Sequence, residues 1–251
     1  MVADGRFAEM TDKSYRQIGV QGRARIVAVC DHASNHVPDE IELGLTGAIL
    51  QEHIAWDIGA AGVCERLARR HAIPAHLSEI SRLVIDHHRE EDSDGLIPVN
   101  SDGHLIAGNI GANRAKRIAD YHAPYHEALG RFLDDTEPGL ILAIHSFTPK
   151  LESRPGEERP WEIGLLYNTD DRAAQHAMRL LRELGVTVGD NEPYSGRELN
   201  ATMNRHAEAK GRPYCAIEIR NDLIRNEAGQ ARWAAIIADV AGRVLVALES
   251  S

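Results

Sequence analysis

Short apolar runs alternate with longer amphipathic segments along the 251-residue chain. Runs rich in β-branched residues, each followed by polar positions, predict buried strands at 25–30, 75–77, 139–144, 161–167, 187–188 and 214–219. Apolar positions that recur at a period near 3.6 predict helices over 54–71, 114–135, 171–184 and 230–248, with a polar helix or loop-helix at 196–211. This alternation is typical of an α/β domain with a mostly parallel central sheet flanked by helices.

Polar and turn-forming residues mark the connections between these elements. Residues 89–111, rich in Asp, Gly, Asn and Ser, predict a long surface loop, and 149–160 predict a lid-like loop. The segment 81–86 predicts a further strand. No repeat or flexible linker divides the rest, so we expect one domain over 23–251, preceded by an N-terminal extension at 1–22.

Charge and cysteine content narrow the functional classes. The chain has 28 Lys and Arg against 38 Asp and Glu, a formal net charge of −10, which disfavours nucleic-acid and anionic-membrane partners. The residues at 1–21 have no apolar core of a secretory signal, and no apolar stretch is long enough to span a membrane. Cys30, Cys64 and Cys215 are widely spaced. We expect a cytoplasmic protein that binds a small molecule, as a monomer or small homo-oligomer.

Candidate chemistry gathers where predicted strands end. His32 follows the run at 25–30, His145 follows 139–144, and Glu218 lies on the last strand. Ligands bind outside the carboxyl ends of strands in open α/β sheets. Two histidines and a carboxylate, with one open position for water, are typical of catalytic zinc sites, and a further carboxylate such as Glu218 can move protons.

Each of these residues also has a purely structural interpretation. A histidine at a strand end is often a cap or a solvated residue, and Glu218 can pair with Arg220 or Arg197. His122 and His126 lie four residues apart on a predicted helix, but the HExxH order of a metal motif is missing. We expect these two to line the pocket or to pack against the loop.

Several motifs in series resemble the N-formylglutamate amidohydrolase family over residues 23–245. They are DHASNHVP at 31–38, SRLVID at 81–86 with Arg89, YHAPYH at 121–126, IHS at 144–146 and AIEIR at 216–220. The resemblance implies a hydrolase of the C–N bond of an N-formyl or N-acyl amino acid, such as N-formylglutamate, with formate as a product. It also implies a core similar to zinc carboxypeptidases and aspartoacylase (zinc-carboxypeptidase/phosphorylase-like), and the family name suggests amino-acid catabolism through histidine degradation.

The resemblance also implies metal ligands. His32 and His145 fall at the positions of two ligands, and we expect a divalent metal, with zinc as first choice. Asn35 stands where those enzymes have a glutamate ligand, and an amide oxygen is a poor zinc ligand. Either Asn35 binds weakly and contacts substrate, or another acid replaces it, or the metal is different or absent. Asp57 is the candidate substitute, although it can instead compensate helix charge.

Substrate-binding and catalytic roles follow from the same resemblance. Arg89, in Asp86-His-His-Arg, resembles the arginine that holds the substrate carboxylate, with His88 where asparagine is expected. Its planar fork matches a carboxylate. Further expected contacts are Arg82, Arg220, Ser146 and His88, although Arg82 can instead be a structural ion-pair partner. Glu218 matches the general base.

Two rival functions stay open. One is a related hydrolase of other N-acyl amino acids or small peptides, motivated by Asn35 and His88. The other is a non-catalytic carboxylate-binding homologue that has lost its metal. A serine or cysteine nucleophile is disfavoured, because the chain has no GxSxG elbow and its cysteines interrupt apolar runs.

Overall fold

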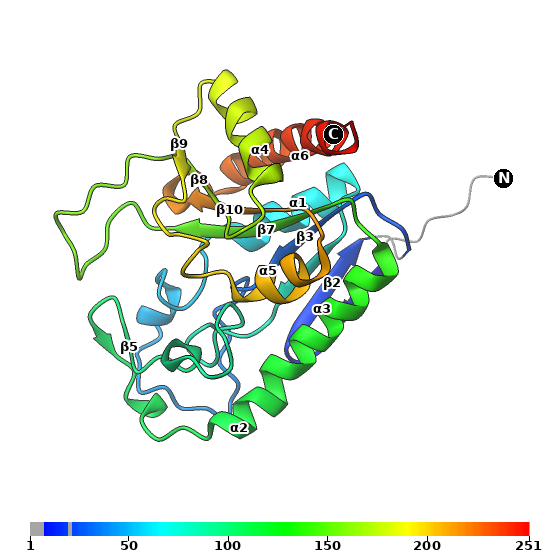
Figure 1. Cartoon of the computed structure of the whole chain (residues 1–251). Coiled ribbons are helices and arrows are strands. Elements are labelled where there is room, and N and C mark those ends of the chain that lie inside the picture. Colours follow the sequence, from blue (N-terminus) through cyan, green and yellow to red (C-terminus); the bar gives the residue numbers. More distant parts are fainter. Residues whose placement is uncertain (1–7, 20–21, 251) are drawn as a thin grey trace.

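The computed structural model describes residues 8–19 and 22–250 (Figure 1). Its main sheet has the strand order β1-β2-β4-β3-β7-β10-β8-β9. These strands are β1 (Ala8–Thr11), β2 (Tyr15–Gly19), β3 (Ile26–Cys30), β4 (Ala75–Ser78), β7 (Leu140–Phe147), β8 (Ile163–Leu166), β9 (Val188–Asp190) and β10 (Tyr214–Arg220). The helices are α1 (Ala60–His71), α2 (Arg114–Arg117), α3 (Ala123–Thr136), α4 (Arg172–Glu183), α5 (Ala201–His206) and α6 (Glu227–Glu249). Among the described residues, none of the helices combines the length and apolar character needed to cross a membrane.

The middle of the sheet is parallel. β4, β3, β7 and β10 run in one direction, and β2 and β8 pair antiparallel at either side of this group. The carboxyl ends of the parallel strands therefore meet at one edge. His32 lies two residues after the end of β3, and His145 on β7 is the register partner of Glu218 on β10. The topology thus brings these distant residues to the same edge.

Helices cover both faces of this sheet (Figure 1). α1, α4 and α6 pack on the face that carries Leu142 and Ile144, whereas α3 and α5 pack on the face that carries Ile141 and Ala143. Successive side chains of a strand point to opposite faces, so the continuous apolar run of β7 is buried on both sides. The predicted α/β domain with a mostly parallel, helix-flanked sheet is confirmed.

Loop segments form a third hydrophobic core next to the edge where the parallel strands end. Side chains from 37–55, 80–106 and Tyr121 bury one another there. The predicted strand at 81–86 is wrong: the backbone N–H groups of Val84 and Ile85 donate to the Ser81 carbonyl in a turn. Its apolar side chains are buried in this third core and not in the sheet, a tertiary effect that the local pattern does not contain.

The start of the first predicted helix and the N-terminal extension differ from expectation. The helix expected over 54–71 begins at Ala60, after Gly59 with a φ of 85°. The preceding turn is held by the Asp57 N–H, which donates to the His32 carbonyl. On the N-terminal side, the sheet continues into the expected extension, because β2 pairs with β4 and β1 pairs with β2.

Buried histidines lie between the sheet and α3. The Tyr125 ring lies 4.7 Å from the ring of His76 and 4.1 Å from that of His87. Burial lowers the pKa of His76 and of His87 to about 3, and that of His206 to about 4. These rings are therefore neutral parts of the core at neutral pH.

We expect Gly59→Ala to lower the free energy of unfolding by about 3 kcal/mol. A positive φ is unfavourable for an L residue by about 1 kcal/mol or more, and the new methyl would overlap the Ile224 carbonyl oxygen. Gly103→Ala is the matched control, because its φ is 87° but no atom lies within 4 Å of the added Cβ. Urea unfolding of both variants measures the difference, and equal losses would contradict the assigned overlap.

We also expect stability to fall as the pH drops below about 6.5. Unfolded histidines bind protons near that pH, whereas burial delays protonation of His76, His87 and His206 to about pH 3 to 4. At these three histidines the unfolded state binds more protons throughout this window, so their titration makes acid favour unfolding, with an uptake by them of about three protons near pH 5. Thermal unfolding as a function of pH measures this uptake. A melting temperature that stays level between neutral pH and about pH 5 would contradict it.

Candidate active site

A cavity of about 340 Å³ opens at the carboxyl edge of the parallel strands. Its floor comes from strand ends and its walls from loops that are far apart in the chain. Candidates from the sequence that line it are His32, Asp57, Arg82, His88, Arg89, His145, Ser146 and Glu218. Small-molecule sites are concavities of this kind.

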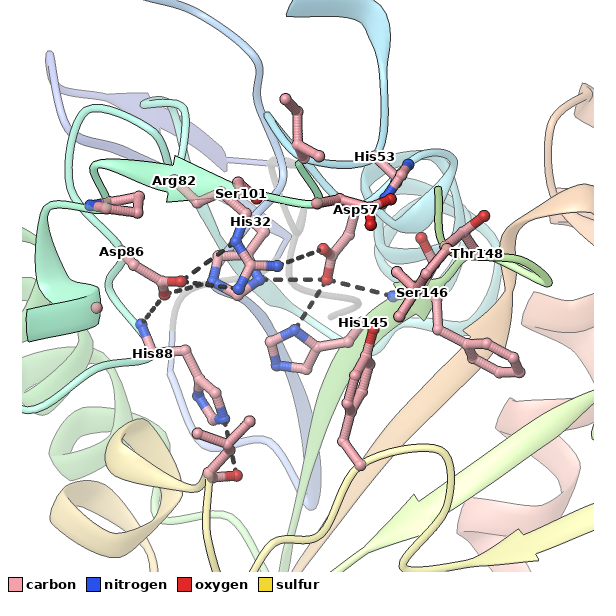
Figure 2. Close-up of a pocket in the computed structure, with 18 of the residues that line it drawn as sticks. His32, His53, Asp57, Arg82, Asp86, His88, Ser101, His145, Ser146 and Thr148 are labelled. Carbon is pink, nitrogen blue, oxygen red and sulfur yellow. Dashed lines mark hydrogen bonds and ion pairs between the residues drawn. The ribbon is translucent and has the colours of Figure 1, made fainter. Parts of the chain in front are cut away.

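Two histidines and one carboxylate converge inside this cavity. Asp57 Oδ2 lies 3.3 Å from His32 Nδ1 and 2.9 Å from His145 Nδ1 (Figure 2). The backbone N–H of Ser146 donates to the same oxygen at 3.2 Å. One donor atom from each of the three side chains lies within 4.8 Å of the others, and all three residues are buried. Asp57 is therefore the acid that stands beside both histidines, as expected for a substitute of the glutamate that Asn35 replaces.

The second nitrogen of each histidine faces another carboxylate. His32 Nε2 lies 2.7 Å from Asp86 Oδ1, and His145 Nε2 lies 3.5 Å from Asp31 Oδ2. Neither Asp31 nor Asp86 is among the site residues predicted from the sequence. Asp31 stands next to His32, and Asp86 stands three residues before Arg89. A search of strand ends for carboxylates as well as histidines therefore finds both.

Ion pairs keep these groups charged. Arg82 Nη2 donates to Asp86 Oδ2 at 2.8 Å, and Arg82 Nη1 lies 3.4 Å from Asp57 Oδ1. Although burial acts the other way, Arg82 lowers the pKa of Asp86, and His32 and His145 lower the pKa of Asp57. In turn, and against the effect of burial, neighbouring carboxylates raise the pKa of His145 well above its usual range. The paired charges stabilise one another in the interior.

Glu218 is a buried acid on the cavity wall. Its side-chain oxygen Oε2 has no hydrogen-bond partner among the described residues. Burial raises the pKa of Glu218 to about 7, against the opposite effect of His145. The alternative pairing with Arg220 does not form, because Arg220 Nε donates to Asp222 at 2.8 Å. A carboxyl group with a pKa near neutrality suits proton transfer.

Three expected substrate contacts are placed differently. Asn35 lies outside the cavity lining, since its amide donates to the Leu50 carbonyl at 2.8 Å. Arg220 also lies outside the lining, with its guanidinium held by Asp222. His88 lines the cavity, but its Nδ1 lies 3.1 Å from Asp31 Oδ2 and its Nε2 lies 3.3 Å from the Leu199 carbonyl.

The remaining histidine pair belongs to another part of the molecule. His122 and His126 line a separate cavity together with Glu91 and Arg205. His126 Nε2 lies 3.0 Å from the His87 carbonyl, so this ring packs against the loop that follows Asp86.

The donor set fits a divalent metal ion. Two imidazoles and a carboxylate are the usual ligands of a catalytic zinc site, and each histidine has a carboxylate at its other nitrogen, as metal-bound histidines usually do. The carboxylates beside His145 raise its pKa and so favour a positive charge at this position, which a divalent cation also supplies. A second group of donors, Asp31, His88 and His145, also lies within 4.8 Å and shares the His145 side chain.

Comparison with known proteins adds independent evidence. The protein family described as N-formylglutamate amidohydrolase matches residues 24–225. No curated protein matches significantly.

Among solved structures, a gene product of Agrobacterium tumefaciens is similar with a TM-score of 0.88 and 30% identity, over 95% of this chain and 97% of that one. The N-formylglutamate amidohydrolase from Ralstonia eutropha JMP134 is similar with a TM-score of 0.72 and 19% identity, over 95% of this chain and 99% of that one, which shows a shared fold. Because the family match covers most of the chain, this protein belongs to the N-formylglutamate amidohydrolase family and is a hydrolase.

Proposed function

We propose that this protein is a metal-dependent hydrolase that cleaves the C–N amide bond of an N-formyl or N-acyl amino acid such as N-formylglutamate. The observation that carries the proposal is the convergence of His32, Asp57 and His145 in the cavity. On the same wall lies Glu218, whose Oε2 has no hydrogen-bond partner in the described part of the chain. Zinc is the metal we propose, because imidazole and carboxylate suit it. The products are formate, or another acid, and the free amino acid.

Proton transfer in this mechanism belongs to Glu218. A bound divalent metal supplies Lewis acidity, which polarises the acyl carbonyl and makes water more acidic. Glu218 accepts the proton of the attacking water and then donates it to the nitrogen of the leaving amine. The raised pKa of Glu218 suits both steps, since the group both takes and releases a proton near neutral pH.

Arginine side chains recognise the amino-acid part of the substrate. Arg89 lines the cavity, and the one ion pair that it forms with the described residues is long, 3.9 Å from its Nε to Asp86 Oδ2. Arg82 is engaged by Asp57 and Asp86, so Arg89 is the better candidate for a substrate carboxylate.

The loop at 149–160 limits the outer part of the cavity. Leu151, Ser153 and Arg154 lie in its lining. The backbone N–H groups of Glu152 and Ser153 donate to the Asp102 carboxylate at 2.9 and 2.8 Å. The loop is thereby fastened to the hairpin of β5 (Asn100–Ser101) and β6 (His104–Leu105), and in this position it limits the access of bulk water.

Asp57 and His88 bear on the two rival functions. Replacement of a glutamate by Asn35 does not imply a lost metal, because Asp57 supplies a carboxylate beside both histidines. A different N-acyl amino acid is the second candidate, because His88 stands where asparagine is expected and its ring faces Asp31.

We expect Glu218→Gln to reduce turnover of N-formylglutamate by about 10²- to 10⁴-fold, because the amide cannot accept the proton of water. The measurement is formate release by the purified protein, together with its zinc content. Zinc content is expected to stay near one equivalent in the variant, since Glu218 is not a proposed ligand.

His32→Ala is the contrasting variant, expected to lose both zinc and activity. If the wild type binds zinc but does not hydrolyse N-formylglutamate, the substrate is another N-acyl amino acid. A wild type that binds no divalent metal would contradict the proposed mechanism.

We expect Arg89→Lys to raise the KM for N-formylglutamate by about tenfold or more with a smaller change in kcat, because lysine keeps the charge but loses the two-pronged contact with a carboxylate. Arg220→Lys is the matched control, since Arg220 lies outside the cavity lining and is expected to leave KM unchanged. Steady-state kinetics measure both. An unchanged KM in Arg89→Lys would assign carboxylate binding to another group.

A further inference from the structure

The motif at 121–126 has no role in the proposed mechanism, yet Tyr125 within it contacts a carboxylate beside the proposed metal ligands. Tyr125, at the N-terminal end of α3, is fully buried, and its hydroxyl donates to Asp31 Oδ1 at 2.7 Å. The other oxygen of Asp31 faces His145. A helix on one side of the sheet is thus linked to a proposed ligand on β7 through one carboxylate.

We infer that Asp31, fixed by Tyr125 and His88, is a positioning residue that holds the His145 ring with Nδ1 toward the metal and the proton on Nε2. The inference rests on the proposed metal site of His32, Asp57 and His145.

The first step concerns the two nitrogens of His145. Its Nδ1 lies 2.9 Å from Asp57 Oδ2, on the side of the ring that faces His32. A neutral imidazole that binds a metal through Nδ1 carries its proton on Nε2. That nitrogen is buried, forms no hydrogen bond within the described part of the chain, and has Asp31 Oδ2 at 3.5 Å. Asp31 is therefore placed to attract this proton.

The second step concerns what fixes Asp31. Its side chain has no exposed surface, and it follows β3 directly, so its backbone is set by the sheet. Tyr125 holds one oxygen, and His88 Nδ1 lies 3.1 Å from the other. The backbone N–H of His88 also donates to Asp86 Oδ1 at 2.9 Å, and Asp86 faces His32. His88 thereby connects the carboxylates behind both histidines, which explains why its ring is turned away from a substrate role.

A burial argument explains why such a carboxylate is kept. A charged carboxyl group in the interior is unfavourable unless hydrogen bonds or opposite charges compensate it. Asp31 has such contacts with Tyr125 and His88, and they leave it few alternative orientations. Removal of the Tyr125 hydroxyl frees one oxygen of Asp31 without changing any proposed ligand.

The experiment measures the zinc dissociation constant by competition with a chromophoric chelator, and the visible spectrum of the cobalt-substituted protein. We expect Asp31→Asn to raise the zinc Kd by about 10- to 100-fold and Tyr125→Phe to raise it by up to about tenfold. Both variants are expected to bind one equivalent of metal with a shifted cobalt spectrum, a signature of altered ligand orientation that loss of stability alone does not produce.

Tyr121→Phe is the matched control. Tyr121 is also buried, lies one turn before Tyr125, and donates its hydroxyl to Glu40 Oε1 at 2.7 Å. The same chemical change there removes an equivalent hydrogen bond that does not reach His145, so the zinc Kd and the cobalt spectrum are expected to stay as in the wild type.

Four other results would contradict the inference or the proposed function on which it rests. An unchanged Kd and spectrum in Tyr125→Phe and in folded Asp31→Asn would show that Asp31 does not position His145. Complete loss of metal in Asp31→Asn, as expected for His32→Ala, would make Asp31 a ligand. Two equivalents of zinc in the wild type, one of them lost in Asp31→Asn, would place a second ion at Asp31, His88 and His145. Should Asp31→Asn fail to fold, Tyr125→Phe decides the question. A wild type that binds no zinc would overturn the proposed function itself.

Discussion

The carboxylate of Asp57 is the point at which separate parts of the chain meet. One of its oxygens contacts a ring nitrogen of His32, a ring nitrogen of His145 and the backbone N–H of Ser146, and the other faces Arg82. None of these contacts is local in sequence. They form only when β3 and β7 are paired and the turn before α1 is closed over their ends. The site is thus a product of the sheet topology together with one turn.

The same turn explains a limit of the sequence analysis. The strands were predictable because β-branched runs such as that of β7 are buried on both faces, and this leaves a strong local signal. The start of α1 was not, because the apolar periodicity extends back through 54–59, whereas Gly59 and the contacts of Asp57 set the beginning of the helix at Ala60. The segment at 81–86 was misassigned because its β-branched residues are buried by loops and not by neighbouring strands.

Some residues of the cavity were predictable from the sequence, and others were not, for a physical reason. His32, His145 and Glu218 follow from the rule that chemistry gathers at the carboxyl ends of parallel strands, and the structure brings them into one cavity. Asn35 and Arg220 lie at similar strand ends, but local hydrogen bonds with Leu50 and Asp222 hold them elsewhere. Which way a side chain turns at a strand end depends on partners that a single sequence does not identify. The contact between Tyr125 and Asp31 spans the sheet and a helix, and no spacing rule anticipates it.

The strand order has a consequence for the way the chain acquires its activity. Val27 pairs with Ile141, and Ile141 pairs with Tyr214, so the central ladders join residues that are far apart in the sequence. Contacts of such sequence separation form slowly, because the loops between them must close first. The strands that carry His32, His145 and Glu218 are these same strands. The cavity that these residues line is therefore complete only after β10, the last of these strands along the chain, has joined the sheet.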